Sequence, residues 1–154
     1  MLEKMKKIYL VFVLLCTVLL SCKKDDDTVT RNQNIPNAAF DTGGLINTSL
    51  PQYNNLLFPG NFITLNDNYG INGVVVYYVG GTNYTAFELS DPNHQLNSCS
   101  RLTMDGTIAV CNCDDGNSYA VPANGLPQSG TTGQFSLVPY PVEVNGNIIR
   151  VFNN

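Results

Sequence analysis

The sequence predicts an all-β fold, an antiparallel sandwich or small barrel built from hairpins. Charged residues make up only 13% of the 154-residue chain, while 13 glycines and 8 prolines supply turns. Short runs rich in β-branched and aromatic residues alternate with Gly-Gly, Asp-Gly and Asn-Gly dipeptides, which are typical of hairpins. After residue 21, no segment has the periodicity of an amphipathic helix.

The N-terminus predicts an export signal and a lipid anchor. A basic segment at 1–7 precedes an apolar run at 8–20, which is too short to span a bilayer comfortably. The run ends in Leu19-Leu20-Ser21-Cys22, which looks like the lipobox of bacterial lipoproteins. That resemblance implies cleavage before Cys22 and acylation of its sulfur, so that the lipid holds the protein on a membrane.

These features predict three parts of the chain. We expect a signal peptide at 1–21, a lipid-anchored flexible linker at 22–37 and one β-domain at 38–154. The linker begins Lys23-Lys24-Asp25-Asp26-Asp27, which resembles the surface-export signal of some Gram-negative lipoproteins. We therefore expect an outer-membrane lipoprotein and leave surface exposure open. The net charge of −4 argues against a nucleic-acid partner, and the sequence identifies no protein or small-molecule partner.

Several short runs in the domain predict strands. The run at 73–79 is continuous in β-branched and aromatic residues, which favours a strand that is buried on both faces. Asn145-Gly146 predicts a hairpin near the C-terminus. Segment 51–59 is expected to be an apolar loop that caps the core, and segment 116–133 a long loop. The expected strands are 45–46, 62–65, 73–79, 84–89, 134–140, 142–144 and 148–152, with a further pair around Asp105-Gly106.

Residues 91–119 hold the chain's single histidine, His94, together with Cys99, Cys111 and Cys113. Between them, Asp105-Gly106 favours a tight hairpin turn. A hairpin there would bring the His94 loop and the Cys111 loop side by side. Two facing loops with these side chains can form a metal pocket or be joined by a disulfide.

From residue 84 to 152 the order of features resembles the Rieske domain. In that family two loops, Cys-x-His and Cys-Pro-Cys-His-Gly, hold a 2Fe–2S cluster, and a third loop covers the site. Pro92-Asn93-His94 occupies the first place here, and Cys111-Asn112-Cys113-Asp114-Asp115-Gly116 the second. The resemblance implies a Rieske-like β-sandwich with His94 and Cys111 as the surviving metal ligands.

The departures from the family pattern decide between the interpretations. Pro92 stands at the first cysteine ligand, and Asp114 or Asp115 at the second histidine, so half of the ligand set is missing. The family also has a disulfide between these loops, which implies a Cys99–Cys113 bridge. Such a bridge would stabilise the fold by roughly 3 kcal/mol in the chain-entropy treatment. Cys111 would then be a buried thiol, or would compete for Cys99.

Three hypotheses follow. The first is a non-catalytic, lipid-anchored domain without a cofactor, in which the cluster site has given way to a structural disulfide and the role is binding or structural. The second is an electron-transfer protein that holds a 2Fe–2S cluster with atypical ligands. The third is a mononuclear metal site formed by His94, Cys111 and an aspartate. We do not expect a hydrolase, because Asp91, His94 and Ser100 crowd one loop without a Gly-x-Ser-x-Gly turn.

Overall fold

The computed structural model describes residues 32–154, which form one compact unit of three four-stranded antiparallel sheets. The predicted all-β, hairpin-built fold is confirmed. The expected signal peptide, the acylated Cys22 and the charged run that follows it lie outside the described residues. Within the described residues no helix is long and apolar enough to cross a membrane.

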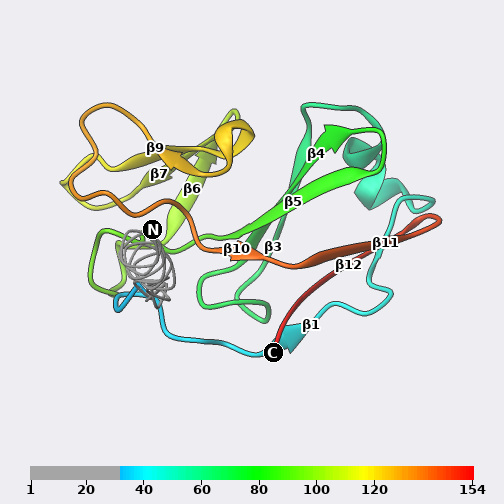
Figure 1. Ribbon diagram of the computed structural model, residues 1–154, viewed down its shortest axis with the longest axis horizontal. Coiled ribbons are helices and arrows are strands. Elements are labelled where there is room, and N and C mark those ends of the chain that lie inside the picture. The colour runs from blue at the N-terminus through cyan, green and yellow to red at the C-terminus, as the bar shows by residue number, and fades with distance from the viewer. Residues whose placement is uncertain (1–31) are drawn as a thin grey trace, which may run out of the picture. The chain divides into compact units, whose positions relative to one another are not determined.

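The central sheet has the strand order β10-β5-β4-β3 (Figure 1). Its strands are β3 (Phe62–Leu65), β4 (Val74–Gly80), β5 (Asn83–Glu88) and β10 (Pro139–Tyr140). As expected from the Gly-Gly turn, β4 and β5 form a hairpin. This hairpin is the green pair that runs through the middle of Figure 1. It ends at Glu88, directly before the loop that carries His94.

The second sheet contains both ends of the described chain. Its strands are β1 (Phe40–Asp41), β2 (Ile46–Asn47), β11 (Val142–Asn145) and β12 (Ile148–Asn153). The predicted Asn-Gly hairpin is present, because Asn145 pairs with Ile148. Strand β12 lies between β1 and β11, and Arg150 on β12 binds the carboxylate of Asp41 on β1 at 2.6 Å.

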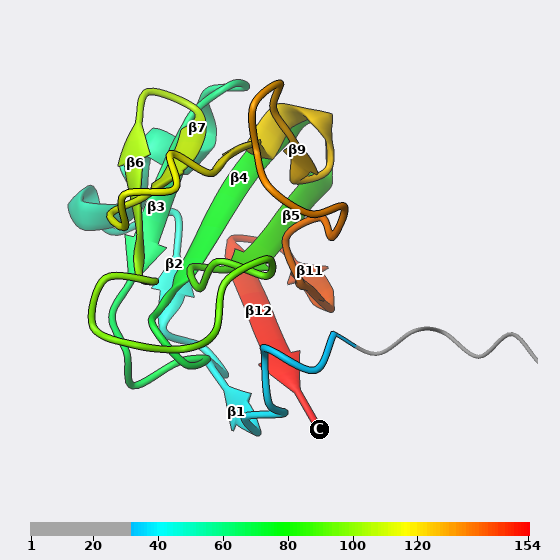
Figure 2. The same ribbon diagram turned by 90° about the vertical axis from the view of Figure 1, so that its left-hand side faces the viewer.

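The third sheet carries the cysteine-rich loops and lies at one end of the domain (Figures 1 and 2). Its strands are β6 (Leu102–Asp105), β7 (Ile108–Cys111), β8 (Ser118–Ala120) and β9 (Leu126–Pro127), in that order. The hairpin at Asp105-Gly106 is present. Segment 116–133, expected to be a loop, instead contains β8, β9 and a 3-10 helix, η2 (Val121–Ala123). The prediction failed there because strands this short carry almost no alternation in the sequence.

Two apolar cores lie on opposite faces of the β4–β5 hairpin. Alternate residues of β4 enter different cores, with Val74 and Val76 in one and Val75 and Tyr77 in the other. This arrangement explains why the strand reads as a continuous apolar run, since both of its faces are covered. The expected capping segment is a 3-10 helix, η1 (Pro51–Leu57), which inserts a fully buried Leu56 into the first core.

The start of the described chain is attached to the domain. The side-chain amides of Asn32 and Asn34 both donate to the carbonyl oxygen of Pro92, at 2.8 and 3.0 Å, and Ile35 is buried. Residues 32–34, which we expected to belong to the linker, therefore contact the His94 loop, while Asn37 hydrogen-bonds to Asn153 and Asn154. The compact unit begins at Asn32.

Candidate functional site

The site consists of two loops at the same end of the β6–β7 hairpin. The first connects β5 to β6 and carries His94 and Cys99, and the second connects β7 to β8 and carries Cys113. Leu102 pairs with Cys111 at the point where both loops leave the hairpin, so the register places the loops beside each other. The facing geometry that the Asp105-Gly106 turn predicted is therefore present.

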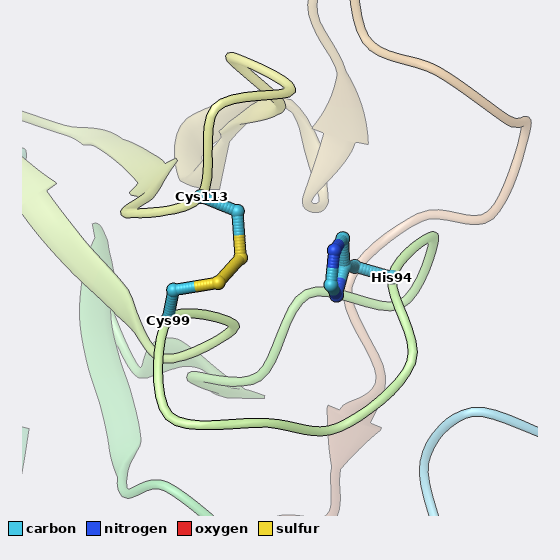
Figure 3. A group of neighbouring side chains, drawn as sticks. All are labelled: His94, Cys99 and Cys113. Carbon is cyan, nitrogen blue, oxygen red and sulfur yellow. A yellow bond between two sulfur atoms is a disulfide. The ribbon is translucent and has the colours of Figure 1, made fainter.

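The two loops are joined by a disulfide between Cys99 and Cys113, whose Cα atoms are 4.9 Å apart (Figure 3). This is the pairing that the resemblance implied. Both cysteines are partly exposed, whereas Cys111 is the free cysteine of the described residues and is buried. The sulfur atoms of two of the three cysteines are thus bonded to each other.

The Cys111 thiol lies behind the disulfide, in the second core. Its sulfur accepts the Cys113 N–H at 3.5 Å and lies 3.9 Å from the carbonyl oxygen of Cys99. Burial, reinforced by the nearby Asp91 carboxylate, raises the pKa of Cys111 to about 12. Because the thiolate is the reactive form, burial and this raised pKa both disfavour reaction of the Cys111 thiol in the folded domain.

His94 faces the disulfide across the gap between the loops (Figure 3). Its side chain is 29% exposed. Nδ1 lies 2.7 Å from the carbonyl oxygen of Gln95, and because a carbonyl only accepts, Nδ1 is the donor. In the neutral ring this leaves Nε2 with a lone pair. Nε2 lies 3.9 Å from Oδ2 of Asp115.

The possible metal ligands fall into two groups. A ring nitrogen of His94 and the sulfurs of Cys99 and Cys113 lie within 4.8 Å of one another. Cys111, Cys113 and Asp115 form the second group by the same criterion. Within residues 32–154, His94 and Cys111 therefore belong to different groups, and neither group contains both residues together with an aspartate.

A fully buried carboxylate, Asp91, is hydrogen-bonded to residues of both loops. It accepts hydrogen bonds from the Asn93 N–H at 2.8 Å, from the side-chain amide of Asn117 at 2.9 Å and from the Tyr119 hydroxyl. Burial, together with the hydrogen bond to Asp91, raises the pKa of Tyr119 well above its usual range. Three donors compensate the desolvation of a carboxylate that has no cation beside it in the described part of the chain.

A third loop, residues 128–136, closes over the same network. The side chain of Asn93 accepts the Phe135 N–H at 2.9 Å and donates to the Phe135 carbonyl at 2.8 Å. Asn117 Oδ1 accepts the N–H and the hydroxyl of Thr132. Gly133, at φ +85°, packs so closely on Asn93 that a Cβ atom would overlap its amide.

The sequence did not reveal this network. Asp91 was predicted only as a member of a rejected triad, and no role in holding the loops together was predicted for Asn93, Asn117 or Tyr119. The available signal was a carboxylate placed directly after a strand and followed by Pro-Asn, which is typical of an Asx turn. The donors that justify its burial lie at least 26 residues away in sequence, except for Asn93.

Asp91, His94 and Ser100 do not form a catalytic triad. Ser100 is fully buried, and its hydroxyl donates to the Asn97 carbonyl at 2.9 Å. The hydrogen-bonding capacity of Asp91 is directed at Asn117 and Tyr119, away from His94. These three side chains are therefore not arranged as nucleophile, base and orienting acid.

The residues present do not fit a 2Fe–2S cluster. Four ligands are required, two on each iron. Pro92 has no ligating atom and is buried, and the sulfurs of Cys99 and Cys113 are bonded to each other. The Cys111 sulfur is enclosed in the core behind that disulfide. Of the two metal ligands that the resemblance implies, His94 and Cys111, only His94 keeps an accessible ligating atom in this conformation.

A groove of about 440 Å³ lies beside β5, where β10 covers only part of that strand's edge. Its lining residues lie outside the two loops that the disulfide joins. Thr85 is one of its lining residues, and the hydroxyl of Thr85 is buried and has no hydrogen-bond partner among residues 32–154. Sequence reasoning did not identify this groove. Its lining residues are Tyr84, Thr85, Ala86, Phe87, Asn124, Ser136, Leu137, Pro139, Tyr140 and Val142.

The chain matches no protein-family model and no curated protein. Among solved structures it is similar to a chain in the complex of reduced oxygenase and oxidized ferredoxin in carbazole 1,9a-dioxygenase. The two are 28% identical over 61% of this chain and 82% of that chain, with a TM-score of 0.40. A TM-score this low does not establish a shared fold.

Proposed function

We propose that the protein is a non-catalytic, lipid-anchored domain of the bacterial cell envelope. In this proposal a Rieske-like cluster site has given way to a structural disulfide. The observation that carries the proposal is the incomplete ligand set, because a buried Pro92 stands at the place of the first cysteine ligand and Asp114 or Asp115 at the place of the second histidine. The Cys99–Cys113 bridge supports it, because it joins the two loops without a metal.

The arrangement of the three loops supports the Rieske-like part of the proposal. The two ligand-loop counterparts meet at one end of a hairpin, and a third, glycine-containing loop packs on Asn93 and Asn117. The resemblance in sequence has the same order of loops. What differs is the chemistry at the centre, where hydrogen bonds around Asp91 hold the loops in place of metal–ligand bonds.

The proposed location rests on the N-terminal sequence and on cysteine chemistry. The lipobox-like Leu19-Leu20-Ser21-Cys22 supports acylation and attachment to the outer membrane. A disulfide is typical of compartments outside the reducing cytosol. Incorporation of a labelled fatty acid into the full chain, compared with a Cys22→Ser variant, tests this part. Equal labelling of both chains would refute it.

For the binding role we favour the groove beside β5. The groove combines apolar walls with polar groups, as binding sites commonly do.

The decisive test of the proposed function is metal analysis of the full chain, expressed in cells that assemble iron–sulfur clusters and purified anaerobically. We expect a colourless protein without iron, and no paramagnetic signal after reduction. A stoichiometric brown chromophore with a Rieske-type signal would replace this proposal with electron transfer. A His94→Ala variant serves as the control, because only a cluster-bearing chain would lose iron on that change.

A further inference from the structure

We propose that reduction of the Cys99–Cys113 disulfide gives the same two loops a second, metal-binding state. When the disulfide is reduced, the thiolates of Cys99 and Cys113 and Nε2 of His94 bind one thiophilic divalent cation of the zinc class. This ligand set differs from the one that the Rieske resemblance implies, since that family uses these two cysteines as a disulfide. The proposal does not depend on the proposed function.

The first support is proximity. The two sulfurs and a ring nitrogen of His94 already lie within 4.8 Å of one another. In a tetrahedral zinc site the metal lies about 2.3 Å from sulfur and about 2.0 Å from nitrogen. Atoms bound to one such ion are therefore separated by roughly 3.5 Å. Small side-chain adjustments would bring the three atoms to those positions, with no change in the strands that carry the loops.

The second support is the state of the histidine ring. Histidines that bind metals usually donate their other ring N–H to a carbonyl or carboxylate, which fixes the tautomer and the ring orientation. His94 does this in the disulfide form, because Nδ1 donates to the Gln95 carbonyl at 2.7 Å. Nε2 is left as the ligating atom. Asp115, with Oδ2 3.9 Å from Nε2, places a negative charge beside the proposed cation.

The third support is accessibility. The two bridged cysteines are partly exposed and His94 is 29% exposed, so a reductant and an ion can reach them. Cys111, by contrast, is buried. The loops also have an anchor that does not depend on the disulfide, since Asp91 links Asn93 in the first loop to Asn117 in the second. We therefore expect them to stay together after reduction.

In the reducing step, a dithiol or phosphine supplies two electrons to the S–S bond. Two protons are taken up, which gives the free thiols of Cys99 and Cys113. The dithiol becomes a disulfide, or the phosphine becomes its oxide by taking oxygen from water. The cation then displaces both thiol protons into solvent as it binds. A small-molecule disulfide, which takes up two electrons and two protons and leaves as two thiols, would re-form the Cys99–Cys113 bond and release the ion.

Cobalt(II) binding to the full chain tests the proposal, because cobalt–thiolate bonds absorb in the near ultraviolet while zinc is silent. A phosphine reductant is used, since it does not compete as a thiol ligand. We expect the reduced chain to gain about one equivalent of bound cobalt with a thiolate charge-transfer band, and zinc to displace it. The disulfide form should show no such band.

Variants separate the proposed ligands from their neighbours. His94→Ala, Cys99→Ser and Cys113→Ser should each weaken cobalt binding about tenfold or more. Cys111→Ala should keep the band, and circular dichroism should show that each variant is folded. The proposal is overturned if the reduced wild-type chain shows no band, whether it stays folded or unfolds. It is also overturned if the disulfide form binds equally well, if His94→Ala binds like the wild type, or if Cys111→Ala abolishes binding.

Discussion

Two fully buried carboxylates, Glu88 and Asp91, lie close together in sequence but organise different parts of the domain. Glu88, at the end of β5, accepts the N–H groups of Ile71 and Asn72 at 2.8 and 2.9 Å and the Tyr140 hydroxyl at 2.6 Å. Asp91 holds the Cys/His loops through Asn117 and Tyr119 instead. Each carboxylate is bound by neutral donors, including one tyrosine.

The difference lies in which parts of the chain supply the donors. Glu88 fixes a turn through backbone N–H groups, and a Cβ atom on Gly70 would overlap its carboxylate, so the contact is tightly enclosed. Asp91 relies instead on the side chains of Asn117, in the loop that carries Cys113, and of Tyr119, on β8. A disulfide also joins that loop to the one that follows Asp91. Glu88 therefore holds a turn against the central sheet through backbone hydrogen bonds. The loops beside Asp91 are held together by side-chain hydrogen bonds and by a disulfide, which are independent contacts.

The largest effects should come from removing each carboxylate in turn. Glu88→Ala leaves two backbone N–H groups and two hydroxyls without their acceptor, so we expect a loss of roughly 4 kcal/mol or more in the free energy of unfolding. Asp91→Ala should cost roughly 3 kcal/mol, because the disulfide still holds its loops. Denaturant unfolding gives both values. Asp114→Ala, an exposed aspartate in the Cys113 loop, is the matched control and should be near neutral.

Hydrogen exchange should separate the two variants by location. Glu88→Ala should increase exchange at Ile71 and Asn72, and Asp91→Ala at Asn93 and in the 128–136 loop. Equal loss of protection across the whole domain in both variants would show that the carboxylates do not organise separate regions.

Removing the disulfide should loosen the loops beside Asp91 and leave the Glu88 region unchanged. The Cys99→Ala/Cys113→Ala double variant opens a loop with a sequence separation of 14, for which the chain-entropy treatment gives a loss of about 3 kcal/mol. Faster exchange should be confined to the loops, with the β4–β5 hairpin unchanged. Cys111→Ala, which keeps the bridge, is the control. A double variant as stable as the wild type would mean that Asp91 alone holds the loops.

The hydroxyl of Thr85 is the one buried side-chain polar group without a hydrogen-bond partner in residues 32–154. The nearby Glu88, by contrast, has four donors. Thr85→Val keeps the shape and removes the unpaired group, so we expect a gain of about 1 kcal/mol in stability. Thermal unfolding measures it, with Thr82→Val, an exposed turn residue, as the control. A loss of stability would reveal a hydrogen bond to water or to another group.

The smallest effect should come from an exposed carboxylate. Hydrogen bonds from Arg150 and from the Gly43 N–H lower the pKa of Asp41 from 3.8 to about 2. Because the folded-state pKa is the lower one, this contribution is present above about pH 4 and disappears as the pH falls through about 2. The difference in melting temperature between the wild type and Asp41→Asn should be small and should vanish over that window. A difference that persists at pH 2 would contradict the assignment.

The sequence was informative where patterns are local. The β4–β5 hairpin, the Asp105-Gly106 turn and the Asn145-Gly146 turn were all predicted, because β-branched runs and turn dipeptides act over a few residues. The short strands β8 and β9 were missed for the converse reason, since their pairing depends on neighbours far along the chain.

The site was only partly predictable. Resemblance to a known family implied the Cys99–Cys113 pairing, and the spacing of the residues brought the two loops together. The burial of Asp91 could not be predicted, because it depends on Asn117 and Tyr119 pointing inward from another strand and loop. The position of His94 was likewise not predictable, since it lies beside the disulfide rather than in a group with Cys111.

Disulfide mapping of the natively expressed full chain tests the central claim most directly. The chain is alkylated without reduction, digested and analysed by mass spectrometry. We expect one cross-linked peptide pair joining Cys99 to Cys113, with Cys111 alkylated only when the chain is unfolded before labelling, because its thiol is buried. A Cys99–Cys111 link, or three cysteines that are all free in the isolated protein, would contradict the account.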